Sequence, residues 1–167
     1  EAAATVILSS RKTDGAIRLS GGSVSNDANH ISGPSRTGEE LYLAIRNALS
    51  QAGISAGGID FISAHGTATR YNDEMEAKAI HLASLEAVPL NSLKGFYGHT
   101  LGAAGLVESI VSLHSLKENT LFPTPGFSSP GTEKPVNVIK ELTSAKLGKC
   151  LKTASGFGGC NAAIVLE

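Results

Sequence analysis

The chain has 167 residues, enough for one domain with a hydrophobic core, and we expect a single domain over residues 1–167. Its 14 basic and 15 acidic residues are spread evenly and give a net charge of −1, which offers no electrostatic basis for binding nucleic acid or an anionic membrane. No apolar run approaches the roughly 18 residues of a membrane span, and the N-terminus lacks a secretion signal. We therefore expect a cytoplasmic protein that binds neither partner.

The N-terminal region predicts two short strands and a long loop. Apolar and β-branched residues predict a strand over residues 5–9, a turn over 12–15 and a second strand over 17–19. Residues 20–34 are rich in Gly, Ser, Asn and Asp without periodicity, which indicates a loop. The first predicted strand begins almost at the first residue and no methionine precedes it, so we expect the chain to be cut from a larger protein.

Alternating helices and strands follow. Thr37–Glu40 has a capping-box pattern, which predicts a helix start there, and an apolar stripe continues to Gly53. The remaining predicted elements alternate in type: a strand over 59–62, a helix over 72–85, a strand over 87–92, a helix over 101–117, and strands over 136–139, 151–155 and 162–166. This order favours an α/β fold whose mainly parallel sheet is covered on both faces, with hairpin strands at the end.

Two histidines lie in loops that follow predicted strands, where function collects in such folds. His65 ends the strand over 59–62, and His99 directly precedes the helix over 101–117. Each is either a structural histidine in a turn or a functional group. The helix N-terminus disfavours imidazolium at His99. Two neutral imidazoles directed at one oxygen would form an oxyanion hole for a thioester enolate or a tetrahedral intermediate.

Other polar residues near these loops have two interpretations each. Lys94 is either solvated or the partner of a buried carboxylate, and Asp73 and Glu76 are either solvent-facing helix acids or members of the same pocket. Gly156–Asn161 forms either a flexible hairpin or a backbone-donor site with Phe157 as a gate.

The two cysteines, Cys150 and Cys160, are too few for a disulfide framework, and we expect both thiols to be reduced and buried. Cys160 has no helix start or base beside it and is a poor nucleophile candidate. The chain shows no metal-ligand spacing and no nucleotide-binding loop, so no cofactor is expected.

Taken together and in this order, the motifs resemble those of β-ketoacyl-acyl-carrier-protein synthases. Ala64–Thr69, continued by Asn72, Asp73 and Glu76, resembles the first histidine motif of that family. Three further segments resemble its second histidine motif, its closing glycine-rich loop and another of its loops: Lys94–Gly105, Gly156–Asn161 and Ser25–His30.

The resemblance implies half of a thiolase-like fold, a five-stranded mixed sheet with helices on both faces. It also implies a Cys-His-His reaction, in which an acyl chain on a cysteine condenses with malonyl-carrier protein after decarboxylation. His65 and His99 match the catalytic pair, Lys94 the lysine that orients the second histidine region, Glu76 its carboxylate partner and Phe157 the gate. Supporting positions are Asp73, Thr67 and Gly158.

A histidine at position 99, where related initiating synthases carry asparagine, points to the elongating type. The first motif has Ala68 where Ser or Gly is commoner, and Cys160 replaces a frequent threonine. Neither cysteine matches the family nucleophile, so we expect the N-terminal, nucleophile-bearing domain to be missing. We expect the chain alone to be inactive and to self-associate or be poorly soluble.

The implied partners are acyl carrier protein carrying malonyl or acyl groups, the N-terminal half, and a second copy in a full-length homodimer. The implied pathway is fatty-acid elongation. Three alternatives stay open: a polyketide-type ketosynthase or its chain-length-factor subunit, a non-catalytic docking module, and a thiolase. The presence of His65, His99 and Lys94 disfavours the docking module, and the lack of a second cysteine motif disfavours the thiolase.

Overall fold

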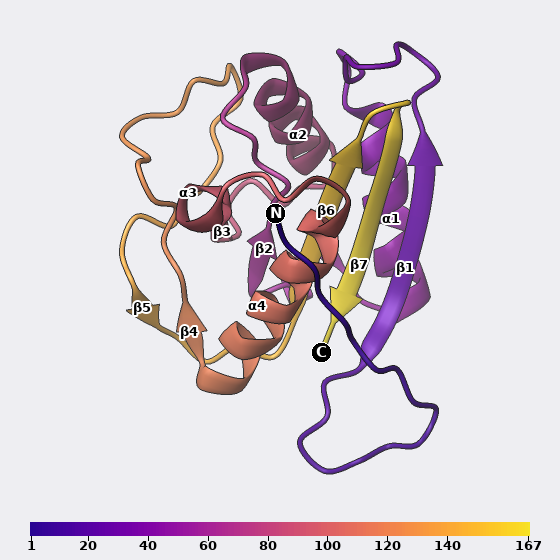
Figure 1. Cartoon of the computed structure of the whole chain (residues 1–167), viewed down its shortest axis with the longest axis vertical. Coiled ribbons are helices and arrows are strands. Elements are labelled where there is room, and N and C mark those ends of the chain that lie inside the picture. The colour runs from indigo at the N-terminus through magenta and orange to yellow at the C-terminus, as the bar shows by residue number, and fades with distance from the viewer.

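The computed structural model describes residues 1–167 and shows a five-stranded sheet between helices (Figure 1). Its strand order is β1-β7-β6-β2-β3. Strands β6, β2 and β3 are parallel, whereas β7 is antiparallel to both β6 and β1. The strands span Leu19–Asn26 (β1), Phe61–Ser63 (β2), Leu90–Asn91 (β3), Cys150–Gly156 (β6) and Cys160–Leu166 (β7). The predicted mixed α/β sheet with a C-terminal hairpin is confirmed.

Helices cover both faces of this sheet. Helices α1 (Glu39–Ala52) and α2 (Arg70–Leu82) pack on one face, and α4 (Ala104–Glu118) packs on the other. Short elements complete the chain: α3 (Lys94–Tyr97), the 3-10 turns η1 (Ala56–Gly58) and η2 (Leu101–Ala103), and a hairpin of β4 (Thr120–Leu121) and β5 (Thr143–Ser144). None of the helices combines the length and apolar composition needed to cross a bilayer.

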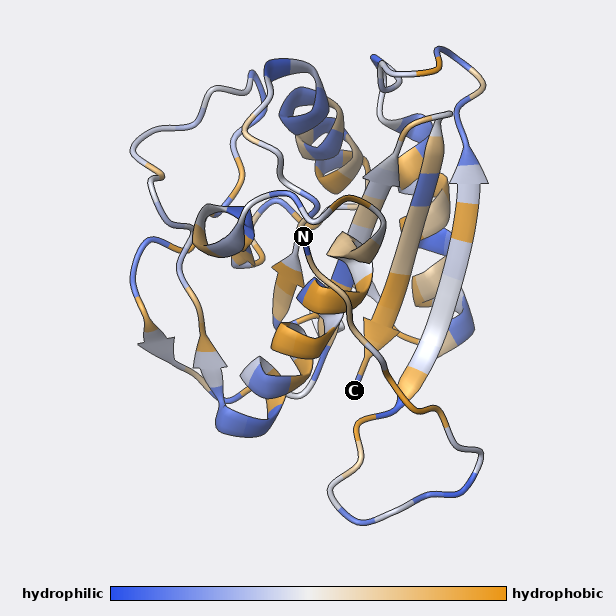
Figure 2. Ribbon diagram, viewed as in Figure 1, coloured by the Kyte–Doolittle hydropathy of each residue, from blue (hydrophilic) through white to orange (hydrophobic).

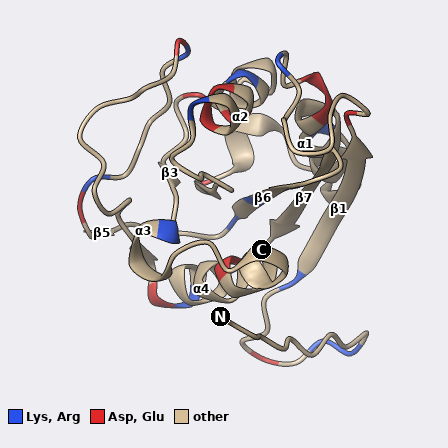
Figure 3. Ribbon diagram, turned by 45° about the horizontal axis from the view of Figure 1, so that its top comes forward, with Lys and Arg blue, Asp and Glu red and all other residues tan.

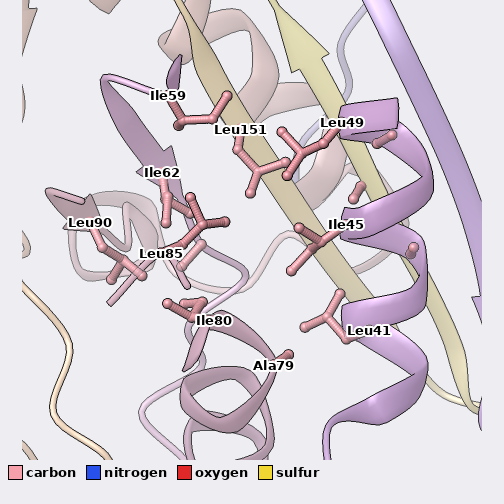
Figure 4. Packing of buried hydrophobic residues seen from close by; sticks show 14 of the residues in the cluster. Leu41, Ile45, Leu49, Ile59, Ile62, Ala79, Ile80, Leu85, Leu90 and Leu151 are labelled. Atoms are coloured by element: carbon pink, nitrogen blue, oxygen red, sulfur yellow. The ribbon is translucent and has the colours of Figure 1, made fainter. Parts of the chain in front are cut away.

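Side chains alternate between the two faces of each strand, so one strand serves two cores. Ile62 and Leu151 pack with α1 and α2, whereas Phe61 and Cys150 pack on the α4 side. Figure 4 shows the stripe of α1 pointing toward Ile62 and Leu151; its members are Leu41, Ile45 and Leu49. Hydrophobic colour accordingly concentrates on β2, β7 and α4 in Figure 2.

The predicted strand over residues 5–9 is wrong. Residues 1–18 contain no strand, and Ile7 and Leu8 are 90% and 74% exposed. An apolar run becomes a strand only when its backbone finds a ladder partner, and none pairs with this segment. The predicted turn over 12–15 is present, with Ala16 N–H donating to the Thr13 carbonyl oxygen at 3.1 Å.

The loop predicted over residues 20–34 is also partly wrong, because β1 continues to Asn26. Pairing with β7 along the whole strand overrides the low strand propensity of its glycines and serines. Gly21 is required there because a Cβ atom would lie 2.2 Å from the Ala48 carbonyl oxygen of α1. The glycine therefore permits close packing between strand and helix rather than a turn.

Helix α1 starts without the predicted capping box. Gly38 occupies the N-cap with φ 77°, and no side chain caps the helix. A Cβ at Gly38 would lie 2.6 Å from the Met75 carbonyl oxygen, so contact between α1 and α2 selects glycine. The other predicted elements are present with shifted ends, except that the strand over 136–139 is reduced to one bridge between Val138 and Leu90.

Candidate active site

His65 lies where the chain leaves β2, and a buried carboxylate fixes its backbone. Glu76, on α2, accepts hydrogen bonds from the N–H of His65 at 2.8 Å and of Gly66 at 2.9 Å. The hydroxyl of Thr153, on β6, donates to the same carboxylate at 2.6 Å. His65 is 5% exposed and Glu76 4%. Glu76 therefore holds the turn that presents His65.

The expected pairing of Lys94 with Glu76 is wrong. Lys94 Nζ lies 2.5 Å from Glu108 Oε1, on α4, and also donates to the His65 carbonyl oxygen. Both oxygens of Glu76 are already occupied by the turn amides, whereas Glu108 is completely buried and needs a cationic partner. Burial lowers the pKa of Lys94, and the Glu108 carboxylate opposes that shift.

Sequence reasoning missed two charged residues, Glu108 and Lys152. Lys152 Nζ, from β6, lies 2.6 Å from Glu108 Oε2, and both side chains are at most 2% exposed. Lys152 is the one charged residue in the five strands of the sheet, and β1 and β7 accordingly carry no charge colour in Figure 3. The sequence contains an indication of both residues. Glu108 is a lone acid in a helical stretch of small and apolar residues, and Lys152 is a lone lysine in a largely uncharged strand, and a single charge in such a segment indicates a buried, paired side chain.

The two histidine rings lie together although they come from different loops. Their centroids are 5.2 Å apart and their planes meet at 78°. His99 precedes η2 and is exposed, and its Nδ1 accepts a hydrogen bond from the Leu101 N–H at 3.1 Å. Lys94 Nζ lies 3.3 Å from His65 Nδ1. The structure thus brings together the three residues that the sequence singled out first.

These contacts select one tautomer of each imidazole ring. A backbone amide and an ammonium group only donate, so both Nδ1 atoms must be acceptors and each neutral ring carries its proton on Nε2. Burial, then the Lys94 charge, lowers the pKa of His65 to about 3. Burial, then Lys94, also lowers the pKa of His99. Both rings are therefore neutral Nε2–H donors near pH 7.

Asp73 and Thr67 support the same turn. Asp73 Oδ1 accepts a hydrogen bond from the Thr67 N–H at 3.2 Å, and the Thr67 hydroxyl lies 2.8 Å from that of Thr69. Burial raises the pKa of Asp73, which the Thr67 amide partly offsets. Asp73 therefore acts on the backbone of the first histidine motif.

Phe157 and Gly158 lie in the turn between β6 and β7, and Phe157 is 79% exposed. Gly158 N–H donates to the Ile31 carbonyl oxygen at 2.6 Å, and its carbonyl oxygen accepts from Asn26 Nδ2 at 2.7 Å. The turn is thus fastened to the segment that follows β1. A gating role for Phe157 stays a prediction.

A cavity of about 590 Å³ opens beside His99 and beside Ala64 and Gly66, the neighbours of His65 in the chain. Lys94, His99 and the backbone around His65 form one wall, and the segment 124–132 forms another. Neither cysteine lines it. Cys150 is buried as expected, and burial raises its pKa to about 12; Cys160 is exposed, so the expectation of two buried thiols is wrong for Cys160.

Comparison with known proteins agrees with this geometry. Residues 17–128 match the family described as "Beta-ketoacyl synthase, C-terminal domain". The chain is 36% identical over 148 residues to 3-oxoacyl-[acyl-carrier-protein] synthase 2 of Rhizobium meliloti (strain 1021), covering 86% of this chain and 35% of that protein. It is 32% identical over 160 residues to a putative polyketide beta-ketoacyl synthase 1 of Streptomyces halstedii, covering 93% and 38%.

Solved structures show the same likeness. A ketosynthase of a type II polyketide system, in complex with its acyl-carrier protein, superposes with a TM-score of 0.85 at 32% identity, covering 89% of this chain and 38% of that chain. A Xenorhabdus doucetiae ketosynthase solved with its chain length factor gives 0.84 at 33%, covering 90% and 38%. The fold is therefore thiolase-like, and the chain belongs to the β-ketoacyl synthase family, where it matches the C-terminal domain. It spans little more than a third of these relatives.

Proposed function

We propose that this chain supplies the histidine pair of an elongating β-ketoacyl-acyl-carrier-protein synthase. One observation carries the proposal: the rings of His65 and His99 lie 5.2 Å apart, and the Nδ1 of each faces a group that only donates. Two neutral Nε2–H donors suit an oxygen that gains negative charge, and they are unsuited to act as bases.

The reaction follows from that pairing. A malonyl thioester loses carbon dioxide, and the electron pair of the broken carbon–carbon bond moves into an enolate whose negative charge rests largely on the thioester oxygen. His65 and His99 donate hydrogen bonds to this oxygen. The enolate carbon then attacks the carbonyl of an acyl group held on a cysteine, the cysteine leaves as thiolate, and a β-ketoacyl thioester remains on the carrier.

The acyl-bearing cysteine comes from outside residues 1–167 in this proposal. Cys150 is enclosed in the core with its pKa raised to about 12, so almost no thiolate forms near pH 7. Cys160 lies outside the lining of the cavity that contains His99. We therefore expect no condensation by the chain alone. Exposed apolar side chains such as Leu101, 73% exposed, are available for a nucleophile-bearing domain to cover.

The proposed substrates are malonyl and acyl groups on acyl carrier protein. The name of the Rhizobium relative supports this, and so does the solved complex of a ketosynthase with its carrier protein. We place the reaction in cytoplasmic fatty-acid elongation, in a full-length homodimer. A polyketide role is the second candidate, because relatives of both kinds match at similar identity.

A chimera tests the proposal. This chain replaces the matching C-terminal segment of the Rhizobium synthase, and condensation of malonyl- with acyl-carrier protein is followed by mass spectrometry. We expect condensation by the chimera and a loss of about 10²–10³-fold in His65→Ala and in His99→Ala. His114→Ala, which removes an exposed histidine of α4, is the matched control. Unchanged condensation in either active-site variant would refute the proposal.

A further inference from the structure

Lys152 is a buried cation surrounded by oxygen atoms. Its Nζ lies 2.6 Å from Glu108 Oε2 and donates to the carbonyl oxygens of Ser63 at 3.3 Å and Ala64 at 3.4 Å, and to that of Thr153. The residue is 3% exposed. A buried ammonium group persists only where such acceptors replace water. These acceptors come from the end of β2, from β6 itself and from α4.

The position of these acceptors matters because Ser63 and Ala64 immediately precede His65. Ser63 is the last residue of β2 and Ala64 is the first residue beyond it, and a buried carbonyl oxygen at a strand end is stabilised by an additional donor. Lys152 supplies that donor to two consecutive carbonyl groups. The strand end that carries His65 is thereby fixed from the side opposite Glu76.

The same ammonium group shares the carboxylate of Glu108 with Lys94. Lys94 contacts Oε1 and Lys152 contacts Oε2, so the two cations together fix the plane of the carboxylate. Without Lys152, Glu108 Oε2 would lose its only cationic contact, and the carboxylate could turn and draw Lys94 away from His65 Nδ1. A second lysine thus sets the position of the first.

Strand geometry explains how one segment reaches both carboxylates. Neighbouring residues of a strand point to opposite faces. Lys152 points to the α4 side and reaches Glu108, whereas Thr153 points to the α2 side and donates to Glu76 at 2.6 Å. Adjacent residues of β6 therefore anchor the two acids that position His65.

We infer that Lys152 is a positioning residue: it holds the strand end before His65 and orients Glu108 so that Lys94 faces His65 Nδ1 and keeps the proton on Nε2. The inference deepens the proposed function and rests on it for the use made of His65. Lys152 touches no substrate in this scheme; it acts through Glu108, Lys94 and the β2 backbone.

The test uses the ¹⁵N chemical shifts of the His65 imidazole in the full 167-residue chain at pH 7. We expect a single Nε2–H form in the wild type and, in Lys152→Met, a mixture with on the order of a tenth or more as Nδ1–H. The amide protons of His65 and Gly66 should also exchange faster. Lys146→Met, which removes an exposed lysine, is the control and should change neither. A folded Lys152→Met chain that keeps one Nε2–H form would overturn the inference.

A wild-type measurement decides the matter if Lys152→Met does not fold. The ammonium protons of Lys152 should exchange slowly with water and correlate with the Glu108 carboxylate carbon; fast exchange without such a correlation would overturn the inference. Neither readout needs substrate or turnover. If the chimera is inactive but the His65 and Lys152 signals are as expected, the proposed function is wrong and the role of Lys152 stands. If the chimera is active but these signals are missing, the role of Lys152 is wrong and the proposed function stands.

Discussion

Replacing Glu76 by glutamine should destabilise the chain strongly although the two side chains have the same shape. The carboxylate accepts from the His65 amide, the Gly66 amide and the Thr153 hydroxyl, and Glu76 is 4% exposed. A glutamine offers one carbonyl oxygen and one NH₂ group, so the NH₂ must face an N–H group. The orientation that keeps most contacts turns the NH₂ toward the Gly66 N–H, and this part-buried amide then loses its acceptor, which costs about 1–3 kcal/mol.

The two remaining hydrogen bonds would change from charge-assisted to neutral, a loss of about 1 kcal/mol each. The sum is about 3–5 kcal/mol, a large part of the roughly 5–15 kcal/mol that stabilises a typical domain. Urea unfolding followed by circular dichroism measures it, with Glu86→Gln, an exposed acid, as the control. A loss in Glu76→Gln no larger than in Glu86→Gln would refute the description of this turn.

Three further predictions concern packing, protonation and the buried charges. Gly21→Ala, whose Cβ would lie 2.2 Å from the Ala48 carbonyl oxygen, should lower the free energy of unfolding by about 1–3 kcal/mol. Gly22→Ala, whose Cβ would lie 3.4 Å from Ile164 Cγ2, should lower it less. Equal losses in the two variants would contradict the packing described. Burial depresses the pKa of His65 to about 3, so its contribution to stability is present above its unfolded pKa of about 6.5 and declines as the pH falls toward 3. Between pH 7 and pH 5 the free energy of unfolding should therefore fall by about 2 kcal/mol more in the wild type than in His65→Gln. Parallel pH curves for the two proteins would disprove this. Glu108→Gln, which leaves the ammonium groups of Lys94 and Lys152 without a carboxylate, should cost about 3–5 kcal/mol in urea unfolding, against little for the exposed Glu118→Gln; a small cost would mean that the pairs contribute nothing.

Local patterns predicted the parts of the fold that depend on local sequence. The apolar stripe of α1 and the hairpin of β6 and β7 were recognisable because periodicity and glycine punctuation lie within single segments. The strand predicted over 17–19 lies at Leu19–Asn26, and its continuation through residues 20–26 is not predictable locally because it depends on pairing with β7, far along the chain. Conversely, the apolar run over residues 5–9 satisfies strand propensity but has no pairing partner.

The candidate site likewise contains residues that local motifs identify and residues whose contacts depend on distant segments. His65, His99 and Lys94 were identifiable from short motifs, and they do come together. The carboxylate partner of Lys94 was assigned wrongly because spacing along α2 shows that Glu76 faces the site, yet says nothing about α4, where Glu108 lies. Lys152 needed both the strand alternation of β6 and the packing of α4 against it.

In the proposed function, His65 and His99 act as a pair on one oxygen. The decisive measurement is carbon dioxide release from malonyl-carrier protein in the chimera, with each histidine replaced by alanine singly and then together. Residues that act as one unit are strongly non-additive. We expect each single variant to lose about 10²–10³-fold in decarboxylation rate and the double variant to lose little more. Decarboxylation at the unmodified rate in either single variant, or losses that multiply in the double variant, would contradict it.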